Sequence, residues 1–355
     1  MSTEKMTMED LFVIGGLHSA TEYQFDEEQA DAIVRATAYH REDFFRSAIH
    51  IPSYILENAE SIATSFPRMS YTGLGSLNRI PLELLQDVLL RLDMRSLARF
   101  RQTNLRSRQT VDSLREYQVV TSHGMNLICA LGRTGYAPFV SLSECYYALC
   151  TKECVSCGEF SGFISFLNWH RCCFKCLKVA PEAQVKTLAA IRKQFGMTKG
   201  RSRQLRSFRT LPGIYSMEES VYETRVRIAS VYQAMLITGR MSDAPPPPNP
   251  VRDQKFNFMG ACELPYYDKR TGKAERGLSC AGCQLALEEG LFGTSIGNWV
   301  SEVRDKLYLR REFLEHFRRC KQAQRLWISS GEGARRAPEL PDFALMGGSC
   351  KALRA

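Results

Sequence analysis

The chain has 355 residues, of which 44% are hydrophobic and 24% charged, and its formal net charge is +9. These values are typical of a soluble globular protein with two or three modules. No stretch of the sequence approaches the roughly 20 consecutive apolar residues of a membrane span, so we expect no membrane segment.

The early residues and the cysteines bear on cellular location. An early apolar run, residues 11–17, is flanked by Glu9, Asp10 and Glu22 instead of a basic leader. We therefore expect no secretory signal and an intracellular protein of the cytoplasm or nucleus. Thirteen cysteines in such a compartment indicate free thiols and metal ligands, because the cytosol and nucleus keep thiols reduced. Disulfides are the less favoured alternative.

Residues 77–114 carry three consecutive helix signals. Pro81 suits the first turn of a helix, where its missing N–H is no loss, and apolar residues then recur at helical spacing. Asp93 can cap a second helix, and Asn104 or Thr103 can cap a third. Isolated helices below roughly 12 to 15 residues are marginal in water, so the three must pack on one another or on a partner.

This order of caps and apolar residues resembles the F-box. The matching residues are Leu77, Ile80, Pro81, Glu83, Leu84, Leu85, Val88, Leu89, Leu92, Ser96, Leu97, Phe100, Arg101, Thr103 and Asn104. The tryptophan usual in the third helix is absent, with Arg108 or Gln109 near that place. The alternative is that these helices form one end of a larger helical core.

The resemblance implies an F-box module at residues 75–117 whose helices bind a Skp-type adaptor protein and, through it, a cullin. F-box proteins of this kind are the substrate-choosing subunits of Skp, cullin and F-box (SCF) ubiquitin ligases. The adaptor-binding residues implied here are Leu77, Ile80, Pro81, Leu84, Leu85, Val88, Leu89, Leu92, Leu97 and Phe100.

A first set of cysteines has the spacing C-x2-C-x15-C-x2-C, which suits one zinc ion. The predicted ligands are Cys154, Cys157, Cys173 and Cys176. Residues 160–169 between the two pairs have the aromatic and β-branched content of strands, so we predict a zinc-stapled β-hairpin. Cys172 is an alternative to Cys173 as a ligand. Further spare candidates are Cys145, Cys150 and His170.

A second set has the spacing C-x2-C-x32-H-x3-C. Its predicted zinc ligands are Cys280, Cys283, His316 and Cys320. We predict residues 311–327 as helix, so that His316 and Cys320 fall on one face, one turn apart. The alternative is that Cys320 packs in the core while His316 faces water, and Cys262 is a substitute candidate.

Both zinc sites are expected to be structural, because four protein ligands leave no open position for an activated water. The sequence contains no phosphate-binding glycine loop and no H-E-x-x-H motif. We therefore expect a non-catalytic protein.

The predicted fold class is mainly α with small zinc-stapled β-hairpins, in which an F-box three-helix module precedes a cysteine-rich α+β region. A long helix is expected near residues 218–238. The predicted segments are a partly disordered N-terminal extension at 1–74, the F-box at 75–117, a helical region with the first zinc site at 118–240, a proline-rich linker at 241–252, the second zinc module at 253–329 and a disordered tail at 330–355.

Residues 147–163, 171–177 and 311–320 also resemble a group of fungal F-box proteins with cysteine-rich regions. This resemblance implies a subunit that serves ubiquitin-dependent protein degradation and binds an unknown protein target through its zinc-ordered region. Two alternatives stay open. One is a zinc-stabilised nucleic-acid-binding protein, suggested by the basic residues of 192–209, and the other is an F-box interaction protein outside any ligase.

Overall fold

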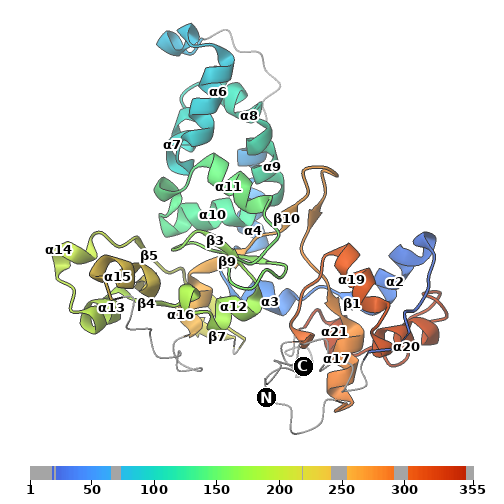
Figure 1. Ribbon diagram of the computed structural model, residues 1–355. Helices are drawn as coiled ribbons and strands as arrows, with labels where there is room; N and C mark the ends of the chain where they lie inside the picture. The colour runs from blue at the N-terminus through green and yellow to red at the C-terminus, as the bar shows by residue number, and fades with distance from the viewer. Residues whose placement is uncertain are drawn as a thin grey trace, which may run out of the picture. The chain divides into compact units, whose positions relative to one another are not determined.

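The computed structural model describes residues 18–19, 21–64, 73–217, 219–240, 254–291 and 303–348 (Figure 1). The chain divides into two compact units. The terminal unit joins the residues up to Phe44 with those from Glu275 onward, and the central unit runs from Phe45 to Ala274. None of the described helices has the length and apolar character needed to cross a membrane. The linker predicted at 241–252 lies outside the described residues.

The first half of the central unit is helical. Its helices are α4 (Ser53–Asn58), α5 (Glu60–Ala63), η2 (Gly75–Arg79), α6 (Leu82–Arg91), α7 (Met94–Arg101), α8 (Leu105–Asp112), α9 (Arg115–His123), α10 (Met125–Thr134), η3 (Ala137–Phe139) and α11 (Leu142–Leu149). Helix α7 packs on α8, and α11 packs on both α6 and α9, as the cyan and green helices of Figure 1 show.

The three helices predicted over residues 77–114 are present as α6, α7 and α8. Helix α6 begins directly after Pro81, which takes the N-cap position. The Asp93 carboxylate accepts a hydrogen bond from the backbone N–H of Ser96 at 2.9 Å, and the Asn104 side chain accepts one from that of Ser107 at 2.8 Å. Each cap satisfies one of the N–H groups that the start of a helix leaves unpaired. Local sequence signals therefore set these helix starts.

A buried ion pair joins α7 to α8. Arg101 Nε lies 2.6 Å from Asp112 Oδ1, and their side chains are only 9% and 10% exposed. Arg101 also donates to the carbonyl oxygen of Thr64 at 3.2 Å, and the Tyr117 hydroxyl donates to that of Ile62 at 2.8 Å. The segment that contains α5 is thereby fixed to α7 and α9. The buried apolar side chains of these helices are Leu85, Leu89, Met94, Leu97 and Val111.

A three-stranded antiparallel sheet follows in the central unit. Its strands are, in order across the sheet, β3 (His170–Cys172), β2 (Phe163–Ser165) and β9 (Ala261–Glu263). Strands β2 and β3 form an antiparallel hairpin with Phe163 opposite Cys172. Strand β2 lies within the predicted range 160–169, whereas β3 follows directly after it. Helix α12 (Phe174–Val179) begins just after β3 and contacts α16 (Gln254–Met259).

The remainder of the central unit contains a second sheet. Its elements are η4 (Pro181–Ala183), β4 (Val185–Thr187), α13 (Leu188–Phe195), α14 (Lys199–Ser202), β5 (Ser207–Arg209), β6 (Gly213–Tyr215), β7 (Ser220–Tyr222), β8 (Arg227–Ser230) and α15 (Val231–Thr238). Strand β8 lies between β4 and β5, β6 pairs with β7, and all these pairs are antiparallel.

The long helix predicted near residues 218–238 is wrong in its first half, because β7 and β8 precede α15 there. The neighbouring residues Ile228 and Ala229 are both fully buried. Adjacent strand residues point to opposite sides, so β8 is covered on both faces and its apolar run has no alternation. Periodicity alone does not distinguish such a run from a buried helix.

The terminal unit is built from both ends of the chain. Its elements are η1 (Glu27–Gln29), α2 (Ala30–Thr37), β1 (Ala38–Tyr39), the start of α3 (Glu42–Ser47), β12 (Ser279–Cys280), α17 (Ala281–Glu288), α19 (Arg310–Phe317), α20 (Lys321–Ser329) and α21 (Asp342–Leu345). The two-residue strands β10 (Tyr266–Tyr267) and β11 (Ala274–Glu275) pair where the central unit ends. Strand β1 pairs with β12, with Ala38 opposite Cys280.

The described part of the tail predicted as disordered is folded, and the N-terminal extension, predicted as partly disordered, contributes helices to the terminal unit. Ile33 of α2 is fully buried in one core cluster with Phe313 and Trp327. Ala344 of α21 is 5% exposed and belongs to a second cluster with Tyr39. These residues are ordered because their apolar partners come from the far end of the sequence, which local composition does not reveal.

Candidate functional sites

The first cysteine group is assembled by a turn and a helix start. Cys154 and Cys157 lie in the turn before β2, where the Gly158 N–H donates to the Cys154 carbonyl at 2.8 Å. Gly158 has a φ of +77°, a conformation that side chains with a β-carbon rarely adopt. Cys173 caps α12, and its sulfur accepts a hydrogen bond from the Cys176 N–H at 3.4 Å. Two C-x2-C segments thus converge at one end of the β2–β3 hairpin.

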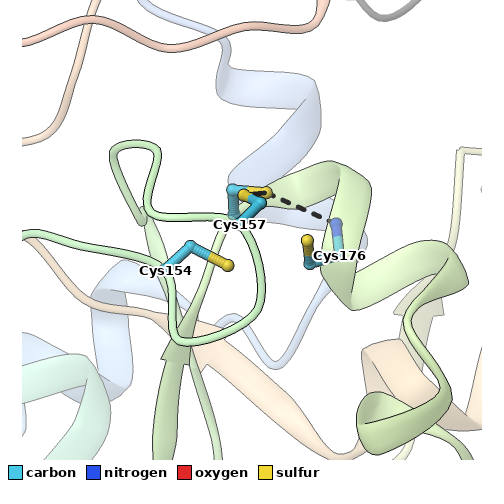
Figure 2. A group of neighbouring side chains, drawn as sticks. Cys154, Cys157 and Cys176 are labelled. Atoms are coloured by element: carbon cyan, nitrogen blue, oxygen red, sulfur yellow. Dashed lines mark hydrogen bonds between the residues drawn. The ribbon is translucent and has the colours of Figure 1, made fainter. Parts of the chain in front are cut away.

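The four sulfur atoms of this group are close enough to share one ion. All of them lie within 4.8 Å of one another, and those of Cys157 and Cys173 are 3.6 Å apart. Figure 2 shows the sulfurs of Cys154, Cys157 and Cys176 directed toward a common space. Four thiolates about 2.3 Å from a tetrahedral zinc would lie roughly 3.8 Å apart. The group could therefore hold a metal ion with four sulfur ligands.

Thiol protonation in this group is uneven. Hydrogen bonds from Cys173 and Cys176 lower the pKa of the Cys154 thiol. The hydrogen bond with Cys154 raises the pKa of the Cys173 thiol. The hydrogen bond between Cys154 and Cys176 raises the pKa of the Cys176 thiol to about 12. Without a cation one thiolate forms at the expense of its neighbours, whereas a bound divalent cation would stabilise all four as thiolates.

The second group repeats the same local arrangement. Cys280 caps α17, and its sulfur accepts a hydrogen bond from the Cys283 N–H at 3.4 Å. The sulfurs of Cys280 and Cys320 are 3.8 Å apart, and Cys283 Sγ lies 3.4 Å from His316 Nε2. The three cysteines are buried, and the four ligand atoms lie within 4.8 Å of one another. This group could also hold a metal ion, with three sulfur ligands and one nitrogen ligand.

His316 and Cys320 do not share one helix as predicted. Helix α19 ends at Phe317 and α20 begins at Lys321, so Cys320 is the N-cap between them. The Cys320 N–H still donates to the His316 carbonyl at 3.0 Å, which places both side chains on one side across a single turn. The side chains of His316 and Cys320 therefore lie on one side, as predicted, although the helix is interrupted between them.

Tyr308 is a neighbour of the second group that sequence reasoning missed. Its ring stacks on the His316 ring at 4.7 Å, and its hydroxyl lies 3.5 Å from His316 Nδ1. Reciprocal backbone hydrogen bonds between Tyr308 and Leu278, both 2.8 Å, hold it beside β12. A polar partner on the second ring nitrogen is the usual support of a histidine ligand. No spacing motif marks Tyr308, because the contact arises in the folded unit.

The remaining cysteines lie outside both groups. Cys172 and Cys262 are buried in β3 and β9, and burial raises the pKa of each thiol. Of the two adjacent candidates, Cys173 belongs to the first group and Cys172 does not. The twelve cysteines among the described residues form no disulfide with one another. Other candidates outside the groups are Cys145, Cys150 and His170.

The first turns of α6 carry an exposed apolar surface. Leu84 and Val88, one helical turn apart, are 59% and 51% exposed, and Leu82, which the leucine spacing did not single out, is 51% exposed. Ile80 just before the helix is 37% exposed. Exposed apolar side chains of this size gathered at the start of one helix are typical of a docking surface. We call Ile80, Leu82, Leu84 and Val88 the α6 surface.

The ten residues implied in adaptor binding therefore divide by exposure. Exposed are Ile80, Pro81, Leu84 and Val88; half-buried are Leu77, Leu92 and Phe100; buried are Leu85, Leu89 and Leu97. The buried three stabilise the helices, and the exposed four are available for contact with another molecule.

Comparison with known proteins identifies this helical segment. Residues 77–118 match the family model of the F-box domain, which spans α6, α7, α8 and the start of α9. No curated protein and no solved structure matches the chain. The chain therefore contains an F-box domain, and the likeness of its cysteine-rich region to fungal proteins stays a prediction.

Proposed function

We propose that this chain is the substrate-recognition subunit of a Skp, cullin and F-box ubiquitin ligase. The observation that carries the proposal is the exposed α6 surface within a segment that matches the F-box domain. F-box domains generally bind Skp-type adaptors. The chain itself performs no transfer chemistry in this role.

The adaptor would cover the α6 surface. Leu84 and Val88 are four residues apart and lie on one side of the helix, whereas Leu85 and Leu89 are 4% and 1% exposed. A partner can therefore cover the exposed side without disturbing the core. Full removal of one such side chain from water contributes about 1.5–3 kcal/mol. Several together are enough for a specific complex, which would lie in the cytoplasm or nucleus.

Two structural zinc ions would order the cysteine-rich region that holds the target. The donor sets are four thiolates in the central unit and three thiolates with one imidazole in the terminal unit, and zinc prefers both. When bound, each ion supplies cross-links and no open coordination position. Holding a target close to the ubiquitin-charged enzyme raises its effective concentration, which accelerates transfer.

Co-purification of the full chain with a Skp-type adaptor and a cullin tests this role. We expect both partners to bind the unmodified chain and to be lost from Leu84→Asp/Val88→Asp. The matched control is Val221→Asp, because Val221 on β7 is 68% exposed and lies outside the F-box. Recovery of the adaptor without cullin would point to a non-ligase F-box protein. A folded chain that binds no adaptor would contradict the proposal.

A further inference from the structure

The positive charge of the chain is concentrated in one part of the central unit. Residues 185–240 contain 11 lysines and arginines against 3 aspartates and glutamates, a net +8 of the chain's +9. No acidic residue occurs between positions 183 and 217. These residues form the β4–β8–β5 sheet, the β6–β7 hairpin and helices α13 to α15. All other residues together are nearly neutral, so the charge belongs to this segment.

Most of this charge faces solvent. Nine of the eleven basic residues are exposed, among them Arg201, Arg203, Arg209 and Arg227. Within the described part of the chain, no carboxylate forms an ion pair with any of these four arginines. Some arginines elsewhere on the surface are paired, as Arg311 is with Glu315. We call the exposed basic residues of 185–240 the basic surface.

Two arginines of the basic surface face each other across the sheet. Arg209 of β5 and Arg227 of β8 are direct antiparallel partners, so their side chains lie on the same side. The adjacent Phe208 and Ile228 are 3% and 0% exposed and fix this register. Like charges placed opposite each other lower stability. Two neighbouring guanidinium groups are also well suited to bind carboxylates, since each offers several donors in a planar fork.

The surroundings favour an acidic polypeptide over a nucleic acid strand. Phe195 and Phe208, the aromatic residues interleaved with the basic residues of 192–209, are only 6% and 3% exposed. They cannot stack on bases, which single-strand binding proteins require of their aromatic side chains. We propose that the basic surface binds an acidic segment of the target protein, with Arg209 and Arg227 as paired contacts. This inference rests on the proposed function and specifies its substrate class.

Fluorescence anisotropy of a labelled oligo-glutamate peptide with the full chain tests the inference. The variant is Arg209→Glu/Arg227→Glu, and the control is Arg270→Glu/Arg311→Glu, which changes the net charge equally at side chains that are both 92% exposed. We expect binding to weaken by about tenfold in the variant and by much less in the control. Binding of the unmodified chain should also fall as salt is raised, because the contacts are exposed.

The fold of the variant is checked with the single change Arg209→Glu. It places a carboxylate opposite Arg227, so the melting temperature should stay equal or rise while peptide binding falls. Three outcomes would overturn the inference: no peptide binding by the unmodified chain, equal loss in variant and control, or tighter binding of a DNA or RNA duplex of matched length. Adaptor co-purification with Arg209→Glu/Arg227→Glu should be unchanged. If the unmodified chain does not co-purify with the adaptor, this would instead contradict the proposed function.

Discussion

Cys283 Sγ lies 3.4 Å from His316 Nε2, although the two residues are 33 positions apart in the sequence. The cysteine comes from the first turn of α17 and the histidine from the end of α19. The second ligand set therefore exists only when the terminal unit is folded. Zinc bound there would stabilise that unit, since binding to a set absent from the unfolded chain adds to the folding free energy.

Loss of one ligand from the second group should remove one zinc. We expect His316→Ala to reduce the metal content from two zinc ions per chain to one and to lower the melting temperature. Tyr308→Phe should keep both ions but weaken the second site by about tenfold in competition with a chelator. Metal analysis and chelator titration measure these effects. Unchanged zinc content in His316→Ala would argue against this site.

The adjacent cysteines Cys172 and Cys173 offer a sharp test of the first group. Cys173→Ala should lose one zinc, because its sulfur lies 3.6 Å from that of Cys157. Cys172→Ala should keep both ions, because Cys172 is buried in β3 outside the group. Zinc measured in the two purified variants checks this. The reverse pattern would transfer the ligand role to Cys172.

The cap of α7 should make stability depend on pH. Partial burial alone would raise the pKa of the Asp93 carboxyl, but hydrogen bonds from Ser96 outweigh it and hold the pKa below its ordinary 3.8. When the pKa of a carboxyl is lower in the folded state, the carboxylate stabilises the fold at pH values above its unfolded-state pKa. This stabilisation is lost as the pH falls through the folded-state pKa. Asp93→Ala should therefore cost about 1 kcal/mol near neutral pH.

The loss of stability caused by Asp93→Ala should shrink toward zero as the pH falls below 3.8. Asp93→Asn is the control, because asparagine also caps helices but does not titrate. Urea unfolding at several pH values gives the measurement. A cost of Asp93→Ala that does not change with pH would show that the carboxylate is not the stabilising group.

The two sides of α6 should respond differently to truncation. Leu89 is 1% exposed, so Leu89→Ala should lower the free energy of unfolding by about 2–5 kcal/mol. Leu84 is 59% exposed, so Leu84→Ala should change it by only about 0.5 kcal/mol while weakening adaptor binding. Urea unfolding and adaptor titration of both variants separate fold from contact. A large loss of stability in Leu84→Ala would place that side chain in the core.

Features defined by neighbouring residues could be predicted from the sequence. The caps Asp93 and Asn104 act on N–H groups three residues ahead, so their signals are local. The same holds for the pairs Cys173–Cys176 and Cys280–Cys283, in which Cys173 and Cys280 cap the helices that carry their partners. These contacts need no knowledge of the rest of the fold.

Features that depend on distant contacts and carry no spacing motif could not be predicted. Ala38 pairs with Cys280, so the first helices join the terminal unit through contacts that no local pattern encodes. The sequence of strand β8 resembles part of a helix, because both faces of the strand are buried and its residues show no alternation between apolar and polar. Leu82 and Tyr308 acquire their significance from exposure and from a ring contact, which only the folded chain defines.

Calorimetric titration of a purified Skp-type adaptor into the full chain tests the central claim most directly. We predict a one-to-one complex for the unmodified chain and for Val221→Asp, and no detectable binding for Leu84→Asp/Val88→Asp with an unchanged melting temperature. The absence of binding by the folded, unmodified chain, or equal binding by all three proteins, would contradict the assignment of the α6 surface to the adaptor.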